Sequence, residues 1–146
     1  MIRKKSRYSV QITLDRLAAA LGEKGIAVAA RIDHALAAEK VGEVLPPTQL
    51  LLFGNPKLGS SLMQSNPCIG LDLPLRVLAW EDTQGQVWLG YTAPQEIALR
   101  YAIGERGAIL DKMTALLDGL TTQAAQACEW KIFRESMGPY LAMRHE

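Results

Sequence analysis

The segment from Thr48 to Asp82 constrains the fold more than any other part of the sequence. A continuous apolar run at 50–53 is followed by an Asn-Pro step at 55–56. A longer, mainly apolar stretch at 73–81 begins with a Leu-Pro step at 73–74. Because proline fixes φ and cannot donate a backbone hydrogen bond, a regular element must begin or end at each step. The segment therefore predicts a buried strand, a turn, a short helix and a second, longer strand.

We expect two strands and a helix before this segment. Residues 7–12 alternate between apolar and polar side chains, which predicts a half-buried strand. Apolar residues at helical spacing over 13–25 predict a helix, with the threonine at its start as N-cap and the glycine at its end as terminator. Alternation resumes at 26–32, which predicts a second strand. The small side chains of Ala27 and Ala29 indicate that another element packs closely on it.

A hairpin and two helices are expected after the segment. The strand at 73–81 and a return strand at 87–91 flank a compact turn, and both alternate in hydrophobicity. Pro94 suits the first position of a helix that ends near 101. Apolar residues then recur at steps of three and four from 110 to 127, which predicts a long amphipathic helix.

This order of elements favours an α+β fold. At 146 residues, with 49% apolar and 21% charged residues, the chain has the composition of an ordinary globular protein. We expect one domain with its own core. An antiparallel or mixed sheet with the two main helices packed on one face accommodates the predicted elements best.

Charge and cysteine content argue against several classes of function. The formal net charge of +1 favours neither a nucleic-acid nor a membrane partner. Cys68 and Cys128 have no CxxC partner, so neither a zinc ribbon nor a disulfide framework is predicted. No apolar run approaches the roughly 18 residues of a membrane span, and no signal-peptide core follows the basic residues at 3–7. We expect a cytoplasmic protein whose basic residues at 3–7 form a solvated, partly frayed terminus.

Four groups of residues resemble motifs of a known bacterial family. They are Ile32-Asp33-His34 with Ala35 and Ala38; Phe53-Gly54-Asn55-Pro56 with Gly59, Leu62 and Met63; Leu71-Asp72-Leu73-Pro74-Leu75-Arg76; and Trp80-Glu81-Asp82 with Gly85 and Tyr91. Taken in this order over residues 7–127, they resemble the uncharacterised family catalogued as domain of unknown function number 302.

The resemblance implies a two-layer α+β domain over 1–127, with a curved, mainly antiparallel sheet, helices on one face and a TATA-binding-protein-like topology as one arrangement. It also implies a homodimer. It implies no activity, because none is established for that family. The extension at 128–146 lies outside the resemblance. Its aromatic residues, Trp130, Phe133 and Tyr140, suit either a helix that docks on the domain or a partner, or a partly ordered tail.

His34 is the titratable residue of greatest chemical interest. It follows Asp33 at a predicted strand-to-helix junction, and a histidine beside a carboxylate can act as a base or bind a metal. The alternative is structural, with Asp33 capping a helix over 34–41 and His34 bonded locally. Glu81 or Asp82 would have to complete a metal site, and because no ligand spacing supports one, we predict no metal.

Residues 54–61 resemble a phosphate loop in composition alone. They contain two glycines, Lys57 and two serines near a predicted helix start, where an anion could bind. The lysine precedes the second glycine, however, which is not the order of a nucleotide-binding P-loop. Asn55 as the N-cap of a helix over 57–64 is the simpler interpretation, and a small anionic ligand is the functional alternative.

Asp72 and Arg76 are the remaining candidates for a ligand site. They lie on one side of the predicted strand by parity, so they are expected either to form an ion pair or to present the arginine to an anion. Cys68 is expected to be a buried small hydrophobe. Trp80 and Trp88 are expected in the core or in a dimer interface.

Three functions remain open on the sequence. The first is a small-ligand-binding or accessory module, with a cleft bordered by Asp33-His34, Asn55 and Lys57 and with Asp72 and Arg76 nearby. The second is a structural or interaction protein that acts through a homodimer or through the aromatic extension. The third is an enzyme with His34 as general base. The sequence names no catalytic set and no cofactor.

Overall fold

A computed structural model describes residues 1–105 and 107–126. The predicted extension at 128–146 and its aromatic residues lie outside the described residues, and so does position 127, where the predicted domain ends. The domain boundary therefore stays a prediction.

One five-stranded antiparallel sheet organises the fold. Its strands are β1 (Ile2–Ser6), β2 (Ala27–Asp33), β3 (Thr48–Gly54), β4 (Leu75–Glu81) and β5 (Val87–Tyr91). They lie in the order β1-β5-β4-β3-β2, and each neighbouring pair is antiparallel. The edges of the sheet are therefore β1 and β2, and the predicted β4–β5 hairpin is confirmed.

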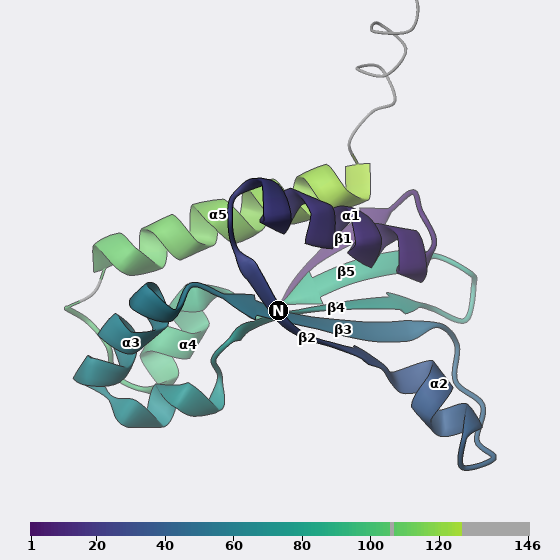
Figure 1. Ribbon diagram of the computed structural model, residues 1–146, viewed down its shortest axis with the longest axis horizontal. Helices are drawn as coiled ribbons and strands as arrows, with labels where there is room; N and C mark the ends of the chain where they lie inside the picture. The colour runs from purple at the N-terminus through teal and green to yellow at the C-terminus, as the bar shows by residue number, and fades with distance from the viewer. Residues whose placement is uncertain (106, 127–146) are drawn as a thin grey trace, which may run out of the picture.

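Two long helices cover one face of this sheet. The helices are α1 (Val10–Glu23), α2 (His34–Glu39), α3 (Pro56–Ser65), α4 (Pro94–Arg100) and α5 (Gly107–Gln126), with a short 3-10 helix η1 (Pro67–Leu71). Figure 1 shows α1 and α5 together on one side, α3 and α4 at one end of the molecule and α2 at the other. The predicted α+β fold with helices on one face is confirmed, and the likeness to the TATA-binding protein stays a prediction.

The core lies between the sheet and these two helices. Leu14 and Leu17 of α1, Leu117 of α5, Phe53 of β3 and Val77 of β4 are all at most 1% exposed. Along β3, buried and half-buried side chains alternate, because successive residues of a strand point to opposite faces. Each fully buried aliphatic side chain contributes roughly 1.5–3 kcal/mol, so this layer supplies the main driving force for folding.

The predicted strand at 7–12 is wrong. The chain turns after Ser6, Ser9 is the N-cap in place of the expected threonine, and its hydroxyl accepts a hydrogen bond from the backbone N–H of Ile12 at 3.2 Å. Buried residues at helical spacing begin at Val10, and Ile12 is exposed. The first turn of an amphipathic helix had the same apolar pattern as a short strand over these few positions.

The expectation of a frayed basic terminus is also wrong. Lys4 lies in β1, and its side chain is 14% exposed. Its ammonium donates to the side-chain carboxylate and the backbone carbonyl of Asp118 at 2.7 and 2.8 Å, and to the hydroxyls of Thr121 and Thr122 at 2.9 and 2.8 Å. The ammonium therefore ties the edge strand β1 to the last turns of α5.

Within residues 1–105 and 107–126, no helix combines the length and the hydrophobicity that crossing a bilayer requires.

Candidate functional site

An apolar cavity of about 460 Å³ lies beside the helix-covered face of the sheet. Its walls come from the start of β2, the end of β3, the start of β4, α3, η1 and the segment after it, and one side of α5. The lining residues are Ile26, Ala27, Ala29, Phe53, Gly54, Asn55, Pro56, Leu58, Gly59, Ser60, Met63, Gly70, Leu73, Pro74, Leu75, Met113 and Leu116. None of them is charged. This volume falls within the roughly 300–1,000 Å³ of small-molecule sites.

Close packing of small residues shapes the wall between α3 and η1. A Cβ placed on Gly59 would lie 3.7 Å from a methyl group of Leu73, and a Cβ on Gly70 would lie 3.2 Å from the sulfur of Met63. Because a contact of 3.2 Å is tighter than most side chains accept, Gly70 allows η1 to approach α3 closely. The cavity is therefore bounded by a compact wall on this side.

Asn55 is the one predicted site residue that lines the cavity. Its side-chain oxygen accepts a hydrogen bond from the backbone N–H of Lys57 at 3.0 Å, which confirms the predicted N-cap of α3. Pro56 occupies the first turn of this helix, as its fixed φ favours. Lys57 is exposed and is not among the lining residues. The predicted partnership of Asn55 and Lys57 around a ligand is therefore wrong for this cavity.

Asp72 braces the segment that connects η1 to β4. One of its carboxylate oxygens accepts hydrogen bonds from the Tyr101 hydroxyl at 2.6 Å and from the Arg100 guanidinium at 2.8 Å, which joins this segment to the end of α4. The Tyr101 hydrogen bond, followed by the Arg100 ion pair, outweighs partial burial and holds the pKa of Asp72 below its ordinary value of 3.8. Arg76 instead donates to the carbonyl of Leu71 at 2.6 Å, so the predicted Asp72–Arg76 pair is wrong.

This brace predicts a pH dependence of stability. We expect Asp72→Asn to lower the free energy of unfolding by about 1–2 kcal/mol at pH 7, because it removes the negative charge that strengthens the hydrogen bonds from Tyr101 and Arg100. Since folding lowers the pKa of Asp72, its stabilisation is complete above about pH 5 and is lost as the pH falls through 3.8 and below. Urea unfolding of both proteins between pH 7 and pH 2.5 measures this difference.

Asp111→Asn, a change to an exposed aspartate of α5, serves as the control, with an expected effect under about 0.5 kcal/mol. A difference between wild type and Asp72→Asn that stays constant or grows as the pH falls would contradict the assignment.

Asp33 and His34 lie at the other end of β2 from the cavity. In the ladder, Asp33 is opposite Gln49, whereas Ala27 at the start of the strand is opposite Gly54. Six residues of strand span roughly 20 Å, so the predicted convergence of His34 with Asn55 is wrong. Figure 1 shows the same separation of α2 from α3. His34 is exposed in the first turn of α2.

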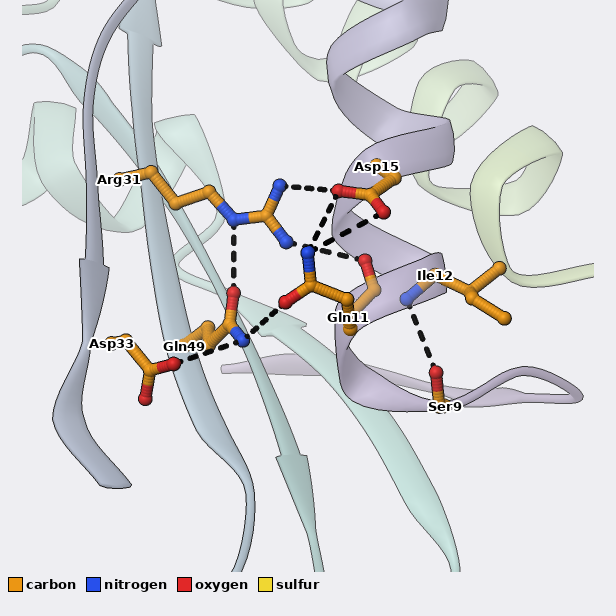
Figure 2. Close-up of polar contacts among 7 residues, drawn as sticks. All are labelled: Ser9, Gln11, Ile12, Asp15, Arg31, Asp33 and Gln49. Carbon is orange, nitrogen blue, oxygen red and sulfur yellow. Dashed lines mark hydrogen bonds and ion pairs between the residues drawn. The ribbon is translucent and has the colours of Figure 1, made fainter. Parts of the chain in front are cut away.

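Asp33 belongs to a polar network that fastens the edge strand β2 to α1 (Figure 2). One carboxylate oxygen accepts from the backbone N–H of Leu36 at 2.9 Å, which confirms Asp33 as the N-cap of α2. The other accepts from the side-chain amide of Gln49 at 3.3 Å, and the same amide donates to Gln11 at 2.9 Å. Both carboxylate oxygens of Asp33 thus accept hydrogen bonds that stabilise the fold.

Arg31 completes this network. Its guanidinium donates to the side-chain oxygen of Gln49 at 2.9 Å, to the carboxylate of Asp15 at 2.6 Å and to the carbonyl of Gln11 at 3.2 Å. Gln49 is 7% exposed, and a buried amide is tolerated there because these partners satisfy its hydrogen bonds. The network therefore holds β2 in its orientation relative to α1. The residues of this strand are otherwise largely exposed.

Cys68 differs from its predicted environment. Cys68 is exposed at the start of η1, which contradicts its predicted burial. Among the residues that the structure describes, no group of three or more His, Cys, Asp or Glu side chains is placed to hold a metal ion.

The sheet face opposite α1 and α5, which we call the outer face, forms a second feature. The residues on it are Arg3 and Lys5 of β1, Trp88 and Gly90 of β5, Arg76, Leu78 and Trp80 of β4, Thr48, Leu50 and Leu52 of β3, and Ala30 and Ile32 of β2. Leu50, Leu52, Leu78 and both tryptophans are half-buried, and Ile32 is 41% exposed. This set contains three cations and no acidic residue.

The two tryptophans of the outer face are held in place. Trp80 lies over Gly90, where an added Cβ would come within 2.8 Å of its ring, so only glycine leaves room for the indole. Trp88 donates its indole N–H to the carboxylate of Asp82 at 2.9 Å, and the ammonium of Lys5 lies 5.6 Å from its ring centre. Neither tryptophan belongs to the core between sheet and helices, so the interface alternative stays a prediction.

Sequence patterns gave little indication of the cavity. Ala27 and Ala29 were expected to contact a packed element, whereas they are exposed and line the cavity. Met113 was expected only to lie on the apolar side of a long helix, and the pattern of that helix did not single out Leu116. Their small or flexible side chains are compatible with a cavity, but no local pattern brings α3 to α5.

The sheet, its two covering helices and the apolar cavity together define a small two-layer α+β domain. The chain belongs to the family described as Domain of unknown function DUF302, whose family model matches residues 2–120. The crystal structure of an uncharacterized conserved protein DUF302 from Bacillus stearothermophilus has the same fold, with a TM-score of 0.68 and 16% identity over 87% of this chain and 96% of that one.

Longer relatives are found in Brucella. The protein named fluoride-specific ion channel FluC 1 of Brucella suis biovar 1 is 42% identical over 125 residues, which cover 86% of this chain and 49% of that protein. FluC 2 of Brucella melitensis biotype 1 is also 42% identical, over 86% of this chain and 46% of that protein. The chain thus spans about half the length of these relatives.

Proposed function

We propose that this domain binds a small molecule in the apolar cavity between β2, α3 and α5. The observation that carries the proposal is a cavity of about 460 Å³ whose walls are almost entirely hydrocarbon and backbone. Exposed apolar surface costs free energy in water, and a ligand that displaces water from this cavity recovers that cost. The small anionic ligand expected from the sequence has no cationic partner in this lining.

Ala29 allows a direct test of the cavity. We expect Ala29→Phe to fill the cavity and to weaken the binding of the neutral hydrophobic dye N-phenyl-1-naphthylamine at least tenfold, as measured by its fluorescence enhancement. Ala29 is exposed on the edge strand β2, next to a register shift, so the larger side chain has room without disturbing the core.

Ala30→Phe is the matched control, because Ala30 is also exposed but points to the outer face opposite Leu52. It should leave dye binding unchanged. No dye binding to the wild type, or equal loss in both variants, would refute the cavity as the binding site.

The outer face supports a second candidate function, an interaction module that forms a homodimer. Its contiguous half-buried apolar side chains are uncovered in the single chain, and such patches commonly mark interfaces. Since the chain spans about half of relatives that are named fluoride-specific ion channels, we propose an accessory role beside such a channel for this module.

A further inference from the structure

We infer that the ligand of the cavity is a neutral, mainly aliphatic or aromatic molecule with a hydrogen-bond acceptor at one end, held by the side-chain amide of Asn55. The inference rests on the proposed function, because it assigns the class of ligand to that same cavity.

The lining excludes a charged group on the buried part of the ligand. No lysine, arginine, histidine, aspartate or glutamate lines the cavity, and its polar side chains are those of Asn55 and Ser60. A carboxylate or ammonium group that leaves water without an opposite charge pays a large desolvation cost. A ligand that binds here is therefore neutral where it enters the cavity.

The mouth of the cavity offers a hydrogen-bond donor. Asn55 and Ser60 are the two polar side chains of the lining, and both are partly accessible to solvent, as are Ala27, Ala29 and Pro56. The side-chain oxygen of Asn55 is engaged by the backbone N–H of Lys57. This bond leaves the Nδ2 group of the amide available as a donor, because no hydrogen bond from it to the described residues is present.

An acceptor such as a ketone oxygen satisfies this donor at the mouth. The apolar body of the ligand then contacts Phe53, Met113 and Leu116 inside the cavity. The arrangement separates one polar end from an apolar body, which is how small-molecule sites fix the orientation of a ligand.

Three ligands of equal chain length test the inference. In competition with N-phenyl-1-naphthylamine at pH 7.5, we expect 2-octanone to displace the dye at concentrations at least tenfold lower than octanoate or octylammonium. Displacement by octanoate as strong as by the ketone overturns the inference of a neutral ligand and leaves the proposed binding function intact. Dye binding without displacement by any of the three also overturns it, whereas absence of dye binding refutes the proposed function as well.

Asn55→Ser separates the donor from the helix cap. Serine is as good an N-cap as asparagine, so α3 should keep its stability, while the amide donor is lost. We expect this variant to bind 2-octanone at least threefold more weakly and the dye as well as wild type does. Unchanged affinity for the ketone, in a variant with wild-type unfolding, overturns the role of Asn55.

Discussion

Phe53→Ala is expected to lower the free energy of unfolding by about 3–5 kcal/mol, the largest effect of any substitution proposed for this protein. Phe53 is fully buried near the end of β3, where it both packs in the core and lines the cavity. Its truncation removes buried hydrocarbon and enlarges an existing space, which the surrounding strands cannot close because β2 and β4 are paired on either side.

Urea unfolding followed by circular dichroism measures the loss. The control is Val28→Ala, because Val28 lies directly opposite Phe53 in the ladder but is 41% exposed. We expect this control to cost about 0.5 kcal/mol. Equal costs for the two variants would mean that Phe53 is not the anchor of this end of the core.

Leu50→Lys is expected to convert the proposed homodimer into monomers. Leu50 lies in the apolar part of the outer face, between Ile32 of β2 and Leu78 of β4. Two copies that pair through this face would bring two lysines into an apolar contact, which costs desolvation without a compensating partner. We expect the dimer dissociation constant to rise at least about 100-fold, which corresponds to about 2.8 kcal/mol.

Sedimentation equilibrium at several concentrations measures this shift. Ala19→Lys, at an exposed position of α1 on the opposite side of the sheet, should leave the dimer unchanged. A monomeric wild type at 100 µM, as an order-of-magnitude concentration for a weak dimer, would contradict the dimer proposal. A dimer that persists in Leu50→Lys would place its interface elsewhere.

The N-caps of α2 and α3 were predictable because their signals are local. Asp33 and Asn55 are the N-caps of α2 and α3, and the proline after Asn55 begins the helix as expected. Each cap depends on a side chain that bonds to a backbone group two or three residues further along. No distant part of the chain takes part, so the pattern of a few residues suffices.

The strand expected at 7–12 failed for a related reason. Over six residues, an apolar alternation and the first turn of an amphipathic helix are hard to distinguish. The choice between them was made by burial against α5, since Val10 and Leu14 point into the core and Ile12 does not. The first strand lies instead at Ile2–Ser6, where the ammonium of Lys4 donates hydrogen bonds to residues of α5.

The candidate site shows the same division between short-range and long-range effects. Local pattern was enough for the order of the elements, for the caps of α2 and α3 and for the hairpin, because those features depend on neighbouring residues. The partner of Asp72 was Arg100 and not Arg76, and Asn55 joined Ala29 and Met113 at one cavity while His34 lay at the far end of β2. Such meetings depend on strand register and on the packing of α3 and α5 against the sheet. These are contacts between distant residues, and a single sequence carries no short-range signal for them.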